Sequence, residues 1–268
     1  MKFLKWLILG YCLILVMLYL IQDFVIFRAN PLPEAYQFKF EQPFVEKNYT
    51  AADGTEVNTL FFPTSQKSKG LLFNNHGNRR NLSRWGRSAE QFTSLGYDVF
   101  FYDYRGFGKT KGKPSEENIF SDSAFLYEEM KKEYSEDSII VYGRSLGSGV
   151  AAKLAAENNP KMLILESAYY SMAEVGKMHL PIFPYKLLIK HPFDTGSRID
   201  KVKCGVKLIH GTEDRLIPVE SSYMLTKKMG KSPEDVLTLL PGGHRGLYRL
   251  DQYQKVWKEW LAPELLTP

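Results

Sequence analysis

The chain has 268 residues, of which 44% are hydrophobic, 14% aromatic and 24% charged. This composition excludes a disordered chain, and the length allows one large domain or two small ones. The formal net charge of +5 comes from lysines scattered among acidic residues rather than from one basic face, which argues against a nucleic-acid-binding protein. Cys12 and Cys204 are the two cysteines, so a disulfide framework is excluded.

An apolar run at the N-terminus is the first organised feature. Residues 6–22 carry no charge and are long enough to span a bilayer. No small-residue cleavage site follows, as a signal peptide would require. Apolar residues surround the whole helix without a polar face, so a buried core helix is the alternative. We therefore expect a single-pass anchor at residues 1–28. Lys2 and Lys5 favour a cytoplasmic N-terminus, with the remaining chain on the non-cytoplasmic side.

The rest of the chain reads as a linker followed by one folded unit. Residues 29–43 combine prolines with mixed polarity and are interpreted as a short linker. Residues 44–268 are expected to form a single α/β domain. Its opening strands are predicted to form an antiparallel hairpin, because residues 52–55 (Ala-Asp-Gly-Thr) have turn chemistry between two β-prone runs.

Short apolar runs then alternate with helix-length stretches. The predicted strands are residues 70–74, 98–102, 138–142, 162–165, 206–209 and 236–240, and the predicted helices include residues 82–95, 119–134 and 149–158. Buried strands that alternate with helices favour right-handed crossovers and a mostly parallel sheet covered on both faces. We therefore predict a doubly wound α/β fold with about eight strands.

The strongest chemical motif is the Gly-Arg-Ser-Leu-Gly sequence at residues 143–147. It follows an apolar strand and precedes a helix rich in small residues. A serine on such a tight turn has a strained backbone and presents its hydroxyl at the positive N-terminus of the helix. Ser145 is therefore the predicted nucleophile.

A nucleophilic serine needs a base, and His244 is the preferred candidate. It follows the last predicted strand on a loop at the carboxyl edge of the sheet, where ligands and catalytic groups collect in open α/β sheets. His76 and His210 stand in strand-end turns and are interpreted as loop anchors. His179 and His191 are interpreted as solvated or packed histidines.

The base in turn needs a carboxylate that orients its ring and stabilises the imidazolium. Asp214 is the preferred candidate, one loop after the penultimate predicted strand. Its neighbour Glu213 and the strand-end Glu166 remain alternatives. Asp103, which ends another predicted strand, is interpreted as structural.

The chain order Ser145, Asp214, His244 resembles that of serine hydrolases of the α/β-hydrolase superfamily. The resemblance covers about residues 44–262 and extends to the motifs at residues 76–78, 102–108, 112–116 and 241–244. Together with the N-terminal anchor, the chain is similar to the membrane-anchored α/β-hydrolase-domain branch, which includes lysophospholipid lipases and protein depalmitoylases. Members usually have small residues after the His-Gly-Asn motif, whereas Arg79 and Arg80 stand here.

The resemblance implies acyl transfer through a covalent acyl-enzyme, with the backbone amides of Asn78 and Leu146 as the oxyanion hole and no metal or organic cofactor. Residues 168–199 are too long for a plain crossover and predict a small cap. With the anchor, this favours an acyl ester or thioester of a small molecule, lipid or acylated protein as substrate, and membrane lipid as a partner. A peptidase or amidase, and a catalytically silent binding protein, are the alternatives.

Overall fold

The computed structural model describes residues 2–266 and contains one eight-stranded sheet with the order β10-β9-β8-β7-β4-β6-β3-β2. β3 runs antiparallel to β2 and to β6, and the remaining neighbours are parallel. The prediction of a mostly parallel sheet of about eight strands, opened by a hairpin, is therefore confirmed. The strands of this sheet are β2 (Val45–Thr50), β3 (Glu56–Phe62), β4 (Leu71–Asn75), β6 (Asp98–Tyr102), β7 (Ile139–Arg144), β8 (Met162–Glu166), β9 (Gly205–Gly211) and β10 (Leu237–Leu240).

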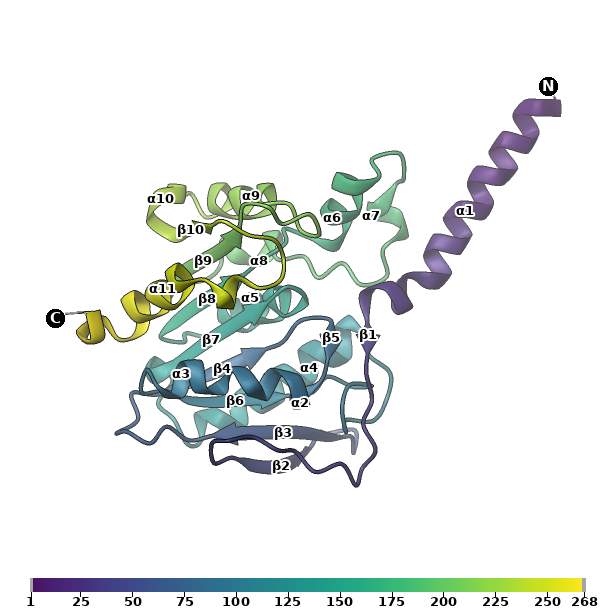
Figure 1. Cartoon of the computed structure of the whole chain (residues 1–268). Helices are drawn as coiled ribbons and strands as arrows, with labels where there is room; N and C mark the ends of the chain where they lie inside the picture. The colour runs from purple at the N-terminus through teal and green to yellow at the C-terminus, as the bar shows by residue number, and fades with distance from the viewer. Residues whose placement is uncertain (1, 267–268) are drawn as a thin grey trace.

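Helices cover both faces of the sheet (Figure 1). They are α2 (Leu82–Trp85), α3 (Ala89–Thr93), α4 (Glu116–Lys131), α5 (Leu146–Glu157), α8 (Gly196–Ile199), α9 (Glu220–Lys228), α10 (Pro233–Val236) and α11 (Asp251–Leu261). Successive residues of a strand point to opposite faces of the sheet, so each strand contributes side chains to two apolar layers. Phe73 and Val141 pack with α4 and α5, whereas their neighbours Leu72 and Ile140 pack with α3 and α11. Both faces of the central strands are therefore buried against apolar side chains, as their continuous apolar runs predict.

The three predicted helices differ from the observed ones in their bounds, and α5 begins at Leu146 rather than at residue 149. α4 begins at Glu116, earlier than expected, because the Ser115 side chain caps it by accepting a hydrogen bond from the Asn118 N–H. The helix expected at residues 82–95 is divided into α2, a 3₁₀ turn (Gly86–Ser88) and α3. Gly86 lies against Phe40, and a Cβ there would come within 2.5 Å of the Phe40 ring. Close packing of the N-terminal linker segment on this helix accounts for the glycine.

The N-terminal helix α1 (Lys2–Ile26) projects out of the domain (Figure 1). Its most apolar stretch has a mean hydropathy of 2.3 and none of that stretch is buried, so length and composition make it a candidate membrane span. Residues 29–43, the predicted linker, are not free of the domain. Phe38 is buried, and Tyr36 and Phe40 pack against the same apolar layer as α3 and α11.

The predicted cap region contains α6 (Met172–His179) and α7 (Tyr185–Leu188) beside α1. The Tyr11 hydroxyl donates a hydrogen bond of 2.9 Å to the carbonyl of Ile182, and its ring stacks on Phe183. Nearer the end of α1, the Gln22 side chain donates to the Leu188 carbonyl (3.1 Å) and accepts from the backbone N–H of Lys190 (2.7 Å). The cap therefore contacts α1 at Tyr11 and Gln22, which are eleven residues apart. At 1.5 Å per residue these two contacts are separated by about 16 Å along the helix axis.

The two apolar layers of the core lead to a prediction about the free energy of unfolding. Leu163 lies in β8 at 0% exposure, and we expect Leu163→Ala to lower the free energy of unfolding by about 2–5 kcal/mol, because it removes buried methyl groups and leaves a cavity. Leu239→Ala, in the edge strand β10 at 37% exposure, is the matched control and should cost about 0.5 kcal/mol. Urea unfolding of the full-length protein in neutral detergent, followed by tryptophan fluorescence, measures both. Equal losses for the two variants would contradict the assignment of β8 to the core.

Candidate active site

Ser145 occupies the turn between β7 and α5. Its backbone has φ 52° and ψ −120°, a conformation that L-residues other than glycine adopt only under constraint. The Ser145 N–H donates to the Glu166 carbonyl at 2.9 Å, which ties the turn to β8. Gly147 makes the tight turn possible, because a Cβ at this position would lie 1.9 Å from the Asn75 carbonyl oxygen. The Gly-x-Ser-x-Gly sequence is thus the strand-turn-helix element that the motif predicts.

Three side chains from separate loops form a hydrogen-bonded row at the carboxyl edge of the sheet. The Ser145 hydroxyl donates to His244 Nε2 at 3.0 Å, and His244 Nδ1 donates to Asp214 Oδ2 at 2.7 Å. These are the three residues singled out in the sequence. The row leaves His244 Nε2 free to take the serine proton while the other ring nitrogen is held by a carboxylate.

The Asp214 carboxylate is fixed and ionised. Its Oδ1 accepts hydrogen bonds of 2.9 Å from the backbone N–H groups of Leu216 and Ile217, which leaves Oδ2 to face His244. Burial would raise the pKa of Asp214, but hydrogen bonds from His210 and His244 hold the pKa well below its usual value. Asp214 is therefore anionic at neutral pH, in a position from which it can stabilise a positive charge on His244.

The other histidines do not reach Ser145. His210 is fully buried and bonds Ser222 Oγ (2.7 Å) and the Ile217 carbonyl (2.8 Å), so it braces the loop that carries Asp214. His76 is also fully buried, and its Nδ1 lies 2.7 Å from the Gly77 carbonyl oxygen. The loop-anchoring interpretation of both residues agrees with these contacts. His179 and His191 bond the Leu216 carbonyl and Asp23 respectively.

The alternative acids have other positions. Glu166 is 1% exposed; Arg144 Nε lies 2.8 Å from its Oε1, and the hydroxyls of Tyr142 and Tyr253 each donate to its Oε2 at 2.7 Å. These contacts give Glu166 a structural role beneath the turn of Ser145. Glu213 is exposed on the surface of its loop.

Asn78 and Leu146 occupy equivalent places beyond the paired strands β4 and β7. Asn75 is in register with Gly143, and Asn78 and Leu146 each lie three residues further along. Leu146 is the first residue of α5, where the backbone N–H has no partner within the helix. Within residues 2–266, no protein group accepts a hydrogen bond from the backbone N–H of Asn78. Both N–H groups are thus available to an oxyanion.

The segment carrying Asn78 is bonded to the end of α1, which the sequence did not suggest. The Asn78 side chain donates to the Ile26 carbonyl at 3.1 Å, and the Asn78 carbonyl accepts from the backbone N–H of Arg28 at 3.1 Å. Here the two-residue strands β1 (Arg28–Ala29) and β5 (Arg79–Arg80) pair in parallel. A pair of strands this short has no hydrophobic period, so only the three-dimensional structure reveals it.

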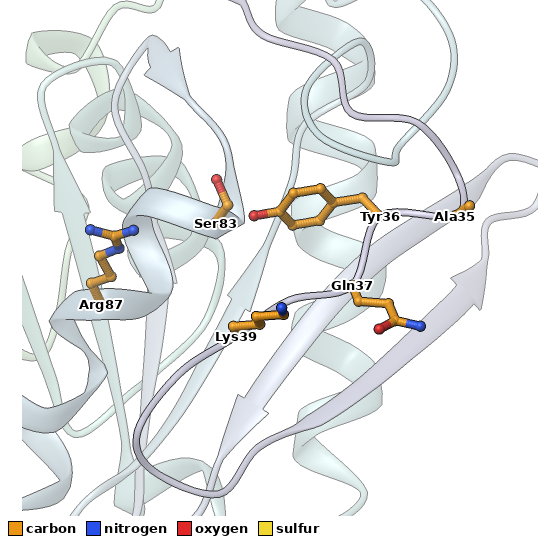
Figure 2. A pocket seen from close by; sticks show the side chains of 6 residues that line it. All are labelled: Ala35, Tyr36, Gln37, Lys39, Ser83 and Arg87. Carbon is orange, nitrogen blue, oxygen red and sulfur yellow. The ribbon is translucent and has the colours of Figure 1, made fainter.

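A hollow in the surface lies apart from these residues. It is lined by Ala35, Tyr36, Gln37, Lys39, Ser83 and Arg87 and has a volume of about 560 Å³ (Figure 2). It lies between the linker segment and the α2 region and contains none of Ser145, Asp214 and His244. We assign it no part in the chemistry.

The sheet, the strained serine turn and the hydrogen-bonded row define a hydrolase of the α/β type. The family model for serine aminopeptidase, S33, matches residues 66–190. An uncharacterized protein of Mycobacterium tuberculosis is 32% identical over 203 residues, which are 74% of this chain and 72% of the relative. The human alpha/beta hydrolase domain-containing protein 17B is 28% identical over 222 residues, which are 80% of this chain and 74% of the relative. The chain belongs to the α/β-hydrolase superfamily.

Solved structures agree with this assignment of the fold. An esterase of Pyrococcus furiosus, Pf2001, superimposes with a TM-score of 0.68 at 20% identity, covering 88% of this chain and 96% of that one. An acetyl xylan esterase from Paenibacillus sp. R4 has a TM-score of 0.65 at 17% identity and covers 85% of this chain and 87% of that one. At these identities the likeness concerns the fold.

The contacts of Glu166 lead to a prediction that separates it from the alternative acid Glu213. Glu166→Ala should lower the free energy of unfolding by about 3–5 kcal/mol, because it leaves the guanidinium of Arg144 buried without its carboxylate. Glu213→Ala, which removes an exposed carboxylate, should change it by about 0.5 kcal/mol or less. Chemical unfolding of both variants is the measurement. A Glu166→Ala protein as stable as the parent would refute the structural role.

Proposed function

We propose that this protein is a serine hydrolase that cleaves acyl esters or thioesters through Ser145, His244 and Asp214. The observation that supports it most is the continuous row of hydrogen bonds from the Ser145 hydroxyl to Asp214, with Ser145 held in a strained turn at the start of α5. In this proposal the function needs no group beyond the side chains and backbone amides of the chain.

In the proposed reaction, Ser145 Oγ attacks the acyl carbon while His244 Nε2 takes the hydroxyl proton. The negative charge that develops on the acyl oxygen is stabilised by the backbone N–H groups of Leu146 and Asn78; losing one such donor costs about 10²–10³-fold in turnover in comparable enzymes. His244 then gives its proton to the departing alcohol or thiol, and an acyl-enzyme remains on Ser145. Water, deprotonated by His244, releases the acid and restores the serine.

Proximity to lipid favours an acyl chain as part of the substrate. The cap carries exposed apolar side chains at Leu180 (51%), Ile182 (68%) and Leu187 (86%), and it lies beside α1. Apolar patches of this kind mark surfaces that contact membranes or partners. If α1 spans a bilayer, this part of the cap borders the lipid, and an acylated lipid or acylated protein can approach Ser145 from the membrane.

A peptidase or amidase is the second candidate, because the matching family model is described as a serine aminopeptidase. The same serine, base and oxyanion donors cleave amides as well as esters. Acyl esters and thioesters are preferred for this chain because of its candidate anchor and the apolar cap. Rates on an octanoyl ester, an octanoyl thioester and an aminoacyl amide, measured side by side, distinguish the two; faster cleavage of the amide would favour the peptidase.

For localisation we propose a single-pass membrane protein with its catalytic domain on the non-cytoplasmic side. α1 is the candidate anchor, and Lys2 and Lys5 lie at its N-terminal end, before its uncharged stretch. The polar residues at its far end have partners in the cap: Gln22 bonds the cap backbone, and Asp23 pairs with His191 at 3.1 Å. These contacts allow the apolar surface of α1 to face lipid while its polar end meets the domain.

Replacing the nucleophile tests the function directly. Ser145→Ala should lower hydrolysis of a nitrophenyl butyrate ester by at least about 10³-fold, because only binding and the oxyanion donors remain. Ser121→Ala is the matched control, since Ser121 is exposed on α4 and donates to the Asn118 carbonyl of its own helix. Undiminished activity of a folded Ser145→Ala protein would reject the proposal.

The orientation is tested with a reporter enzyme that is active only outside the cytoplasm. Fused after the C-terminal residue of the full-length chain, the reporter should be active, because two lysines hold the N-terminus inside. The same reporter placed before Met1 should be silent. An expressed but silent C-terminal fusion, with an active N-terminal one, would reverse the proposed topology.

A further inference from the structure

Four arginines gather beside the candidate active site. Arg79 and Arg80 directly follow Asn78, and Arg245 directly follows His244. Arg28, two residues beyond the last residue of α1, is in register with Arg79 through the pairing of β1 with β5. We call these four residues, Arg28, Arg79, Arg80 and Arg245, the arginine cluster. Two loops of the candidate site and the segment that follows α1 each contribute positive charge to it.

The charges of the cluster act on one another. Partial desolvation, and then the positive charges of Arg28, Arg245 and Arg80, lower the pKa of the Arg79 guanidinium from its usual value. All four residues are exposed. Like charges that are close together repel one another, so the fold pays a cost to hold them there unless an anion joins them.

The described part of the chain gives the cluster no acidic partner. Within residues 2–266, no Asp or Glu forms an ion pair with Arg28, Arg79, Arg80 or Arg245. Other arginines of the chain are paired: Arg105 with Asp122 at 2.7 Å, for example. The arginine cluster is therefore an unneutralised positive site at the surface.

The backbone beneath the cluster is held rigidly. Arg80 has φ 71°, in the left-handed region that residues other than glycine seldom adopt. The Arg79 carbonyl accepts a hydrogen bond of 3.0 Å from the Trp85 indole, and the preceding Asn78 is bonded to both Ile26 and Arg28. The cluster is thus positioned by a strained, hydrogen-bonded segment rather than by chance on a mobile loop.

We propose that the arginine cluster binds the anionic headgroup of the substrate, and that this substrate is a phosphate-bearing acyl lipid taken from the membrane. This inference rests on the proposed acyl-ester hydrolysis and specifies its substrate class. Guanidinium groups match phosphate oxygens in geometry and charge. Asn78 and His244 each adjoin one arginine of the cluster, so a headgroup bound there brings its acyl ester toward Ser145.

The position of Arg28 favours a lipid over a soluble phosphate ester. Arg28 stands two residues beyond the last residue of α1, where an apolar span ends and lipid headgroups begin. In a glycerophospholipid, only the glycerol unit separates the phosphate from the acyl ester. One lipid molecule can therefore present both groups to neighbouring parts of the same site.

The test uses full-length protein in neutral detergent and two lipids that share the acyl chain and the phosphate but differ in the headgroup alcohol and in net charge. Monopalmitoyl lysophosphatidylglycerol is anionic, and monopalmitoyl lysophosphatidylcholine is zwitterionic; the readout is the ratio of their kcat/KM values for fatty-acid release. We expect the parent protein to favour the anionic lipid by about tenfold or more. Equal values for the two lipids would overturn the proposal.

Variants of the arginines test whether the preference for the anionic lipid depends on the arginine cluster. Arg79→Gln with Arg245→Gln should reduce the ratio by about tenfold, and Arg79→Lys with Arg245→Lys should retain most of it. Arg87→Gln is the matched control, because Arg87 is an exposed arginine that lines the separate hollow of Figure 2. If the double Gln variant lowers kcat/KM equally for both lipids, the arginine cluster does not distinguish their headgroups.

Two further measurements distinguish a failure of the arginine-cluster proposal from a failure of the proposed hydrolysis. Binding of fluorescently labelled lysophosphatidylglycerol and lysophosphatidylcholine to Ser145→Ala protein requires no turnover, so the arginine dependence of this binding tests the cluster even if hydrolysis of every ester is absent. Glycerol phosphate, which has no acyl chain, should compete only at millimolar concentration. Competition at micromolar concentration would assign the cluster to a soluble phosphate ester, and a stronger arginine dependence for an acylated acidic peptide would assign it to a protein substrate.

Discussion

The close approach of β4 and β7 at the centre of the sheet is the constraint on which the candidate site depends. Asn75 and Gly143 are in register there, and Gly147 allows the first turn of α5 to pass against the backbone after β4. A Cβ at Gly143 would lie 2.4 Å from the Gly147 carbonyl oxygen, so a side chain at Gly143 would push α5 away from β7, and one at Gly147 would push α5 away from the end of β4. Because these segments stay together, the proposed nucleophile Ser145 and the oxyanion-hole candidates Asn78 and Leu146 share one edge of the sheet.

The same edge carries two very different kinds of ionic group. Beneath the serine turn, Arg144 and Glu166 form a buried pair completed by two tyrosine hydroxyls, and such pairs are costly to break because each charge is left without water. The arginine cluster, in contrast, has exposed charges that no carboxylate within residues 2–266 pairs with. The buried pair maintains the shape of the turn, whereas the exposed cluster remains available to an anionic group.

Much of the fold was predictable because its signals are local. Apolar runs of strand length, separated by helix-length stretches, predict the parallel sheet, and the glycines around Ser145 predict the turn. Asp214 and His244 follow strand ends, and the carboxyl ends of parallel strands meet at one edge. Their union with Ser145 in one hydrogen-bonded row is the observed geometry, while their catalytic roles remain a proposal.

The contacts between the N-terminal segment and the domain were not predictable from the sequence. The β1–β5 pair joins residues about fifty positions apart through backbone groups, which carry no residue-specific signal. The Asn78 side chain bonds the Ile26 carbonyl across a similar separation in sequence. The cap partners of Gln22 and Asp23 are still further away in sequence, by 166 and 168 positions. The strained Arg80 was noted as a departure from the related family, but the gathering of Arg28 and Arg245 around it appears only in three dimensions.

The central claim is that Ser145 is a nucleophile activated by His244. Its most direct test is to treat the full-length protein with a fluorophosphonate and locate the adduct by peptide mass spectrometry. The account predicts a single adduct on Ser145, with labelling at least about 10²-fold slower in His244→Ala, because the hydroxyl then has no base to take its proton. An adduct on another residue, or labelling of Ser145 that is equally fast without His244, would contradict it.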